Sequence, residues 1–400
     1  MQYREIPKTG DKISIIGYGC MRFPTRMGRI DEKKAEEQIR YAIDQGVNYF
    51  DTAYPYHNGD SERFLGKVFS DASLRSKVKI ATKLPPWSVK SRDDMDRILQ
   101  DQLKKLQVET IDYYLIHGIM GQDVWDRMKQ LGVIEFLENA RKQGYIKNVG
   151  FSCHSDLQTF KNVIDDYDWS MCQIQYNYLD ENNQAGTEGL KYAAERDVAV
   201  FIMEPLRGGN LAGKIPKQVQ EEWDKAEEKR SPAQWALRWI WNHPEVTCVL
   251  SGMNNDDHIR ENIRTAKTTI AGSMSQDEID RVERVRDIYK SLTKVPCTAC
   301  AYCMPCPAGV NIPQCFQQYN NKYLFGGFEA RLMYLVQLGG VMSDKSEKAS
   351  QCINCGKCEK HCPQHIEIRK ELKNVSSELE GIIDRPLSWL ARRAMRIKKD

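Results

Sequence analysis

The residues with the clearest chemistry are cysteines in the C-terminal part of the chain. Of the 13 cysteines in the 400 residues, eight form two short runs, and each run ends in a Cys-Pro pair. Thiols at such short intervals indicate metal or cluster ligands in a reducing compartment, whereas a secreted protein would use them as disulfides. The eight candidate ligands are Cys297, Cys300, Cys303, Cys306, Cys352, Cys355, Cys358 and Cys362.

Both runs resemble the two-cluster ferredoxin pattern C-x2-C-x2-C-x3-C-P, in which the fourth cysteine of each run binds the other 4Fe–4S cluster. The second run fits in full, and the first has two residues instead of three before its last cysteine. The crossing rule then gives Cys362 to the first cluster and Cys306 to the second. The alternative is structural zinc, which usually takes two C-x2-C pairs. Runs of four closed by Cys-Pro favour iron–sulfur clusters.

The larger, N-terminal part of the chain alternates short apolar runs with segments of helical periodicity, such as 31–45, 92–106 and 124–143. Eight such units in roughly 270 residues predict an α/β protein, a closed (β/α)8 TIM barrel. The open doubly wound sheet is the alternative, but it would need a third glycine after Gly17-Tyr18-Gly19. The predicted strands are residues 13–17, 47–51, 78–83, 111–117, 146–151, 171–176, 198–203 and 246–250.

The predicted domain order is a barrel over residues 1–290, a cysteine domain over 293–372 and a basic helical tail over 373–400. A helix over 276–292 is expected to lead out of the barrel. The 45 residues between Cys306 and Cys352 contain two helix-forming stretches. They favour a helical ferredoxin-like fold, because a compact β-type ferredoxin has less room between its half-sites. The amphipathic tail helix is expected to pack on its own protein; the alternative is a membrane or partner site.

Polar residues stand at the ends of three successive predicted strands, which is where TIM barrels carry their working residues. These are Asp51, Lys83 and His117, and Tyr56 follows Asp51 by five residues. A nearby Lys83 ammonium would lower the pKa of Tyr56 from its ordinary value of about 10. Asp51 would hold Lys83, and His117 could orient a carbonyl oxygen. Each residue alone has an ordinary structural explanation, but together they predict a proton donor that serves a hydride-transfer reaction.

A longer pattern surrounds these four residues. It consists of Phe50-Asp51-Thr52-Ala53, Tyr56, Ser61-Glu62, Leu65-Gly66, Ala81-Thr82-Lys83 and the run 112–117. This pattern resembles the signature and the lysine and histidine strands of the aldo-keto reductases. With the cysteine runs, the chain resembles the ferredoxin-fused members of that family in bacteria and archaea. The resemblance implies an NAD(P)-dependent oxidoreductase with Tyr56 as general acid; Tyr54 has the wrong spacing.

The same resemblance implies a nicotinamide nucleotide site. The family's serine and glutamine contact the carboxamide, a strand-seven residue packs on the ring, and the following loop covers the pyrophosphate. Where NADPH-specific members carry a lysine and an arginine for the 2′-phosphate, this chain has Gly252 and His258, so NADP versus NAD stays open. The implied cofactor-binding residues are Ser152, Gln173, Met203, Leu206, Arg207, Gly252, His258, Glu261 and Asn262.

The composition gives no support for some classes of binding partner. The formal net charge is +3, which gives no electrostatic case for nucleic acid or for a membrane surface. No run approaches the 18 or so apolar residues of a membrane span, and residues 1–5 lack an apolar signal core. We therefore expect a cytoplasmic enzyme that acts on a small-molecule carbonyl or alcohol.

One mechanistic question stays open in the sequence. A hydride carries two electrons, whereas a 4Fe–4S cluster passes one at a time. A flavin, a substrate radical or a redox protein partner would have to connect them, and the sequence shows no flavin motif. The alternatives are an electron-transfer subunit whose barrel is a scaffold or docking module, and a reductase with purely structural metal.

Overall fold

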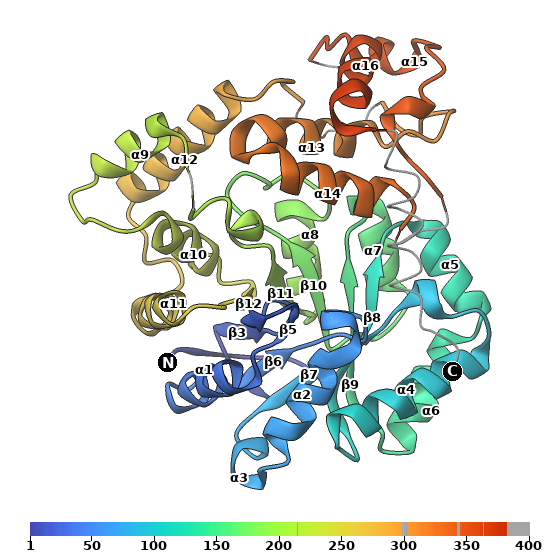
Figure 1. Ribbon diagram of the computed structural model, residues 1–400, viewed down its shortest axis with the longest axis vertical. Coiled ribbons are helices and arrows are strands. Elements are labelled where there is room, and N and C mark those ends of the chain that lie inside the picture. Colours follow the sequence, from blue (N-terminus) through green and yellow to red (C-terminus); the bar gives the residue numbers. More distant parts are fainter. Residues whose placement is uncertain (214, 298, 300–302, 342–344, 363, 382–400) are drawn as a thin grey trace. The chain divides into compact units, whose positions relative to one another are not determined.

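The computed structural model describes residues 1–400 except 214, 298, 300–302, 342–344, 363 and 382–400. The chain divides into two compact units (Figure 1). The first unit comprises Met1–Gly209 and Arg230–Ile279, and the second comprises Asn210–Lys229 and Asp280–Asp400. In the described part, no helix is both long and apolar enough to cross a membrane.

The first unit is built on a closed barrel of eight strands in the order β10-β11-β12-β3-β6-β7-β8-β9, and every neighbouring pair is parallel. The predicted TIM barrel is therefore confirmed, and the open sheet is excluded. The strands read as continuous apolar runs because both of their faces are buried. They are β3 (Ile16–Gly19), β6 (Tyr49–Asp51), β7 (Lys79–Leu84), β8 (Ile111–Ile119), β9 (Ile146–Cys153), β10 (Met171–Gln175), β11 (Ala199–Met203) and β12 (Val246–Ser251).

The start of the first predicted strand, 13–17, is wrong. Lys12–Ser14 is a separate strand, β2, which pairs antiparallel with β1 (Tyr3–Glu5), and the barrel strand begins only at Ile16. Ile13 packs in one apolar cluster with Tyr49 and Tyr113, residues near the starts of barrel strands. The hairpin thus closes the amino end of the barrel, and an unbroken apolar run could not reveal the bend between the two strands.

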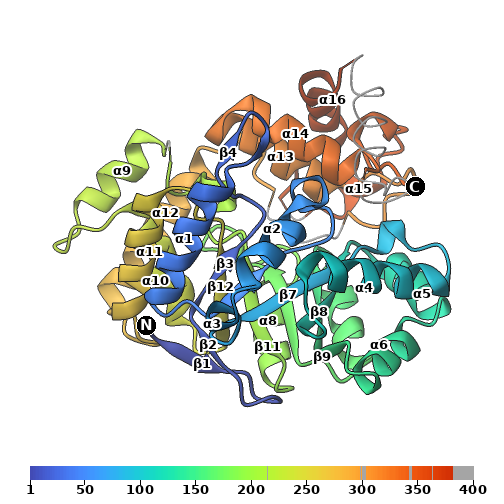
Figure 2. The same ribbon diagram turned by 60° about the horizontal axis from the view of Figure 1, so that its bottom comes forward.

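Helices cover the outside of the barrel. The predicted segments 31–45 and 92–106 form α1 (Glu32–Asp44) and α4 (Arg92–Leu106). The predicted segment 124–143 is two helices, α5 (Gln122–Gln130) and α6 (Val133–Lys142), because Gly132 takes a φ of 80° between them. Figure 2 shows α1 beside α11 and α4 beside α6. The other elements of this unit are α2 (Asp60–Phe69), α3 (Ala72–Arg75), α7 (Leu157–Asp165), α8 (Gly186–Ala194), α10 (Pro232–Asn242), α11 (Asp256–Thr268) and the short strands β4 (Thr25–Arg26) and β5 (Arg29–Ile30).

The second unit is helical in its described part. Its core joins Val295, Phe316, Tyr319, Leu372 and Val375 with further buried apolar residues. This confirms the helical character predicted for the cysteine domain. The predicted tail helix over 387–399 lies outside the described residues. The helices are α9 (Lys217–Asp224), α12 (Gln276–Ser291), α13 (Ile312–Phe325), α14 (Gly327–Leu338), α15 (Lys357–Lys360) and α16 (Ile368–Leu379); α12 begins in the first unit.

One segment of the second unit comes from the middle of the barrel sequence. Residues 210–229 are inserted between β11 and α10, and they carry α9. The buried Glu222 carboxylate of α9 accepts from Arg281 at 3.3 Å and from Arg284 at 2.8 Å on α12. The sequence predicted one barrel domain over residues 1–290 and gave no sign of this insertion.

Candidate active site

The first three predicted catalytic residues lie at the carboxyl ends of adjacent strands. Asp51 is the last residue of β6, Lys83 lies near the end of β7, and His117 lies towards the end of β8. Lys83 Nζ donates to Asp51 Oδ1 at 2.5 Å and to the Thr52 carbonyl at 2.8 Å. Lys83 is only 1% exposed. A buried ammonium needs such a partner, because an uncompensated charge in the interior is strongly destabilising.

Tyr56 joins this group from the turn that follows β6. It begins the 3-10 turn η1 (Tyr56–Gly59), in which His57 and Asn58 have positive φ angles. Lys83 Nζ lies 5.2 Å from the centroid of the Tyr56 ring, and the ring stands edge-on to the His117 imidazole with centroids 5.9 Å apart. The structure thus brings all four predicted catalytic residues together.

The expected shift of the Tyr56 pKa is wrong in its net direction. Burial raises the pKa of Tyr56, and the charge and hydrogen bonding of Lys83 lower it by less. The net pKa lies above the ordinary value of about 10, so the phenol holds its proton at neutral pH. The sequence identified the neighbour that lowers the pKa but could not show how deeply the ring is buried.

Tyr54, the rival tyrosine, has other partners. Its hydroxyl donates to Asp101 Oδ2 at 2.7 Å, and Lys105 Nζ lies 3.7 Å from its ring centroid. Both partners come from α4, on the outside of the barrel. Tyr54 is therefore held by the helix layer, while Tyr56 faces Lys83.

His117 is a buried, neutral imidazole. Burial is the main cause that holds its pKa well below the usual range, and the charges of Lys83 and His154 act in the same direction. Its Nδ1 is buried and has no hydrogen-bond partner among the described residues, and the same holds for Nε1 of Trp87, whose ring centroid is 5.0 Å away. Buried polar atoms are normally satisfied, so these nitrogens mark a place where a polar ligand group fits.

Two predicted carboxamide contacts lie on adjacent strands. Gln173 of β10 and Ser152 of β9 are register partners. Gln173 donates to Asp51 Oδ2 at 2.6 Å, while its Oε1 is buried without a partner among the described residues. Ser152 Oγ accepts from the Gly118 amide at 2.7 Å, which leaves its hydroxyl proton to donate. A free acceptor and a donor match the NH₂ and C=O of a carboxamide, so these residues fit a nicotinamide.

The turn after β11 carries three more predicted cofactor residues. Met203 ends the strand and is half-buried, and Leu206 and Arg207 follow it. Arg207 Nε lies 3.0 Å from Oδ2 of the buried Asp180, which also accepts from Asn177 Nδ2 at 2.9 Å. Arg207 is thus held by a carboxylate that the sequence did not single out.

The loop after β12 passes close to an arginine from the loop after β3. The Arg22 side chain lies against Gly252. A Cβ atom added to Gly252 would come within 3.2 Å of Cβ and Cδ of Arg22, so a larger residue there would crowd this arginine. Arg22 Nη1 donates to the Gly208 carbonyl at 2.8 Å. Arg22 therefore connects the loops after β3, β11 and β12, and the sequence gave no sign of this role.

The adenine-side residues predicted on α11 have different surroundings. His258 is exposed, Glu261 is half-buried, and the buried Asn262 donates to Ser251 Oγ at 3.2 Å. Asp256, the first residue of α11, pairs with Lys34 Nζ at 2.6 Å. Since this lysine balances the carboxylate, the local charge does not decide between NAD and NADP.

Comparison with known proteins agrees with this geometry. The sequence model of the Aldo/keto reductase family matches residues 15–287. The chain belongs to the aldo/keto reductase family. A second family model, the 4Fe-4S dicluster domain, matches residues 296–367, so this aldo/keto reductase carries an iron–sulfur domain at its C-terminal end. Both predicted resemblances are confirmed.

Individual relatives are distant. L-galactose dehydrogenase of Arabidopsis thaliana is 24% identical over 316 residues, which cover 73% of this chain and 97% of that protein. Aldo-keto reductase YhdN of Bacillus subtilis is 29% identical over 238 residues, covering 56% of this chain and 68% of that protein. Among solved structures, the holo form of aldo-keto reductase AKR11C1 from Bacillus halodurans superposes with a TM-score of 0.61 at 23% identity, over 71% of this chain and 96% of that one. This likeness supports the fold.

The cysteine runs of this aldo/keto reductase share a local conformation. Ala299 and Asn354 each lie two residues after the first cysteine of a run, and both have positive φ angles, 57° and 56°. The Asn354 amide donates to Cys352 Sγ at 3.4 Å. The partly buried cysteines Cys297, Cys303, Cys306, Cys352, Cys358 and Cys362 pack against the core of the second unit. An apolar wall with backbone donors suits a cluster.

The other three cysteines of this region are not among these partly buried ones. Cys355 is exposed, and Cys300 lies outside the described residues. Cys315 is buried in α13, where burial raises the pKa of its thiol. In the described part, no three Cys, His, Asp or Glu side chains surround one point as ligands of a single ion would. A cubane has an iron at each ligated corner, so its thiolates do not converge on one point.

A buried network that the sequence did not reveal supports β7. Glu62 Oε1 accepts from Thr82 Oγ1 at 2.6 Å and from Gln102 Nε2 at 2.8 Å. Gln102 Nε2 also donates to the Lys83 carbonyl at 3.0 Å. The network joins α2 and α4 to the strand that carries Lys83. The sequence held one signal of this network: Gln102 is a polar residue on the buried face of the predicted helix over 92–106.

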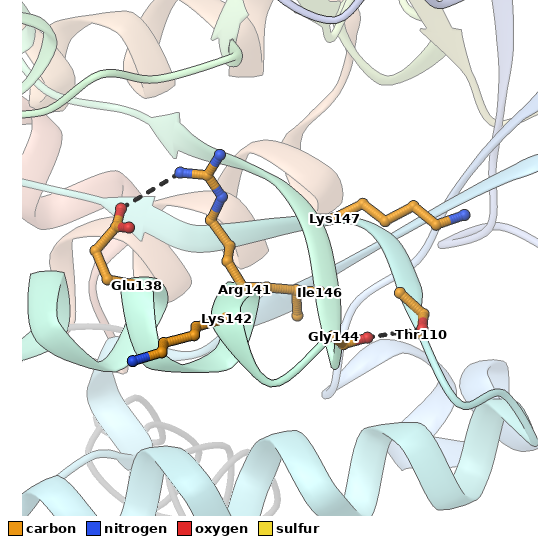
Figure 3. A pocket seen from close by; sticks show the side chains of 7 residues that line it. All are labelled: Thr110, Glu138, Arg141, Lys142, Gly144, Ile146 and Lys147. Atoms are coloured by element: carbon orange, nitrogen blue, oxygen red, sulfur yellow. Dashed lines mark hydrogen bonds and ion pairs between the residues drawn. The ribbon is translucent and has the colours of Figure 1, made fainter.

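A surface pocket lies at the other end of the barrel. Figure 3 shows it lined by Thr110, Glu138, Arg141, Lys142, Gly144, Ile146 and Lys147. These residues lie at the starts of β8 and β9 and on α6, whereas Lys83 and His117 lie towards the strand ends. Four of its lining residues pair within the pocket: Thr110 donates to the Gly144 carbonyl at 2.7 Å, and Arg141 Nη1 lies 3.4 Å from Glu138 Oε1. This pocket is separate from the candidate active site.

Proposed function

We propose that this aldo/keto reductase reduces a small-molecule carbonyl, or oxidises the corresponding alcohol, with NADH or NADPH as the hydride carrier and Tyr56 as the general acid. The observation that carries the proposal is the buried Asp51–Lys83 pair, 2.5 Å between Oδ1 and Nζ, next to Tyr56. The charge and hydrogen bonding of Lys83 also lower the pKa of Tyr56 against the effect of burial, as a proton donor requires.

The proton that the carbonyl oxygen gains comes from a side chain of the protein. A nicotinamide nucleotide, when bound, would supply the hydride and hence both electrons for the carbonyl carbon. Tyr56 Oη gives its proton to the carbonyl oxygen, so the product is an alcohol. The Lys83 ammonium stabilises the phenolate that is left. Asp51 keeps the ammonium charged and in place. The neutral His117 orients the carbonyl oxygen by a hydrogen bond.

The residues of the chain also suggest how the nucleotide is held. Gln173 Oε1 and the Ser152 hydroxyl would bind the carboxamide, and Met203 would pack on the ring. The loops on either side would hold the phosphates and the adenosine. The residues that we assign to these loops are Leu206, Arg207, Gly252, His258, Glu261 and Asn262.

For the C-terminal domain, we propose two 4Fe–4S clusters that pass single electrons. Pairing by the crossing rule gives Cys297, Cys300, Cys303 and Cys362 for one cluster, and Cys352, Cys355, Cys358 and Cys306 for the other. Because hydride chemistry moves two electrons, a redox protein partner, a flavin or a substrate radical would have to connect the two activities. The thiolate-rich domain fits the reducing cytoplasm. The domain bounds that we propose along the sequence are 1–290, 293–372 and 373–400, although residues 210–229 and 280–290 belong to the second compact unit.

The test uses anaerobically purified full-length protein and a matched pair of variants, Tyr56→Phe and Tyr54→Phe. We expect wild type to oxidise NADH or NADPH with an aldehyde or quinone from a panel. Tyr56→Phe should lower kcat by about 10²–10⁴-fold, with nucleotide affinity unchanged. Tyr54→Phe should keep most of the activity, because its hydroxyl bonds to α4.

Two results would overturn the proposal. If the two variants behaved alike, Tyr56 would not be the acid. If wild type bound neither nucleotide in a fluorescence titration, the barrel would be a scaffold for an electron-transfer subunit. Iron and sulfide analysis should give about eight of each per chain, as two cubanes require.

A further inference from the structure

The second cysteine run presents one of its predicted ligands to solvent. Among the cysteines that the structure describes, Cys355 alone is exposed. Ile353, two residues earlier in the same loop, is 66% exposed. Asn354 and Gly356, with φ angles of 56° and 73°, hold the loop in this conformation.

Unbalanced positive charge follows directly in the sequence. Lys357 and Lys360 of α15 are exposed, and neither has an ion pair or hydrogen bond among the described residues. The acids nearby are already paired: Glu359 with Arg369 at 2.8 Å and Glu367 with Lys370 at 2.7 Å. The two lysines are therefore available to an outside partner. We call Ile353, Cys355, Lys357 and Lys360 the α15 face.

We propose that the α15 face docks an acidic one-electron carrier protein. Weak redox complexes bury small interfaces, with apolar contacts at the centre and charged residues at the rim. Ile353 supplies the apolar part, and the two lysines supply charge that attracts an acidic partner and speeds its association. This inference rests on the proposed function, because such a carrier has a purpose here only if the cysteines hold clusters.

The charge pattern favours a protein over a nucleic acid. Nucleic-acid affinity comes from several phosphate contacts at once, whereas this face offers two unpaired lysines around an apolar residue. The whole chain has a formal net charge of only +3. Charge complementarity on this small surface therefore fits a compact acidic protein that docks and leaves quickly.

The experiment measures binding rather than turnover. The anaerobic, cluster-loaded full chain is titrated with an acidic plant-type [2Fe–2S] ferredoxin by calorimetry at several salt concentrations. We expect affinity to fall as salt rises, because exposed charges are screened. The double variant Lys357→Glu/Lys360→Glu should bind about tenfold more weakly. Its matched control, Lys77→Glu/Lys104→Glu, changes two exposed lysines of the barrel unit by the same charge and should bind like wild type.

Further arms separate the alternatives. Ile353→Ser should weaken binding without changing its salt dependence, and cytochrome c, a basic one-electron carrier, should bind more weakly than the ferredoxin. Equal effects of the two double variants, equal affinity for cytochrome c, or equal affinity for a short single-stranded DNA would each overturn the inference. Iron content and cluster absorbance are measured on every sample. A wild type without iron contradicts the proposed function, whereas a loaded wild type that binds ferredoxin independently of Lys357 and Lys360 contradicts only this inference.

Discussion

The buried charge of Lys83 is balanced by one carboxylate, that of Asp51. Lys83 is buried, and Asp51 is its ion-pair partner at 2.5 Å. We expect Asp51→Asn to lower the free energy of unfolding by about 3–5 kcal/mol, because it leaves the ammonium buried without a counter-charge. Urea unfolding followed by circular dichroism measures the loss.

The control for this prediction is an exposed ion pair of the same unit. Lys8 and Asp168 also lie 2.5 Å apart, but the Asp168 side chain is 84% exposed. Asp168→Asn should therefore cost under about 1 kcal/mol. Equal losses in the two variants would show that burial does not set the cost at Asp51.

The buried imidazole of His117 makes stability depend on pH. Burial, Lys83 and His154 hold its pKa well below the unfolded value of about 6.5. Below pH 6.5 the unfolded chain therefore binds a proton that the folded chain does not. This group should lower the free energy of unfolding by up to about 1.4 kcal/mol per pH unit, from pH 6.5 down to its folded pKa.

The measurement is urea unfolding of wild type and His117→Gln across a pH series. The glutamine variant lacks this titration, so its stability should fall less steeply than that of wild type in the acidic range. Above pH 7 the two curves should run parallel. Parallel curves throughout would mean that His117 is not kept neutral by the fold.

At the scale of elements, the turn after β11 depends on one buried acid. Glu204 and Arg207 have positive φ angles, 52° and 46°, which are strained for residues with side chains. The buried Asp180 holds Arg207 at 3.0 Å. We expect Asp180→Asn to raise the Kd for NAD(P)H by about tenfold with a small change in kcat. Without the carboxylate, a smaller fraction of the molecules has this turn in the conformation that binds the nucleotide.

Tryptophan fluorescence quenching by NADH and NADPH measures this Kd. Asp165→Asn is the matched control, since Asp165 pairs with Arg196 on the barrel surface at 3.0 Å. A kcat that fell as much as the affinity, or an affinity that did not change, would show that Asp180 does not act by positioning the turn.

The elements also show what the sequence could and could not predict. Continuous apolar runs located all eight barrel strands, and the polar residues at their ends located Asp51, Lys83 and His117. The β1–β2 hairpin was missed because Ile13 and Ile16 read as one apolar run. The net pKa of Tyr56 was missed because desolvation depends on tertiary burial. Asp180, Arg22 and Gln102 were missed because their partners are distant in sequence.

At the scale of the whole molecule, the chain forms two hydrophobic cores, and a segment of the second unit is inserted in the sequence of the first. The barrel sequence contributes residues 210–229 to the unit that holds the cysteines, and Glu222 fixes this insertion to α12 through Arg281 and Arg284. The insertion begins at Asn210, three residues after Arg207. The polypeptide thus links the turn that we assign to the nucleotide with the unit that we assign to the clusters.

Separate cores predict separate melting. The barrel core joins apolar residues such as Tyr49, Tyr113 and Phe201, whereas the second core is lined by the cysteines themselves. Because metal binding contributes directly to folding in small metal domains, removing iron with a chelator under reducing conditions should unfold the second unit and leave the barrel intact.

Calorimetry of the loaded protein should show two transitions. Chelation should abolish one of them and leave the midpoint of the other within a few degrees. The double variant Cys352→Ser/Cys355→Ser should reproduce the loss without a chelator. A single transition that moves as a whole would show that the two units fold as one.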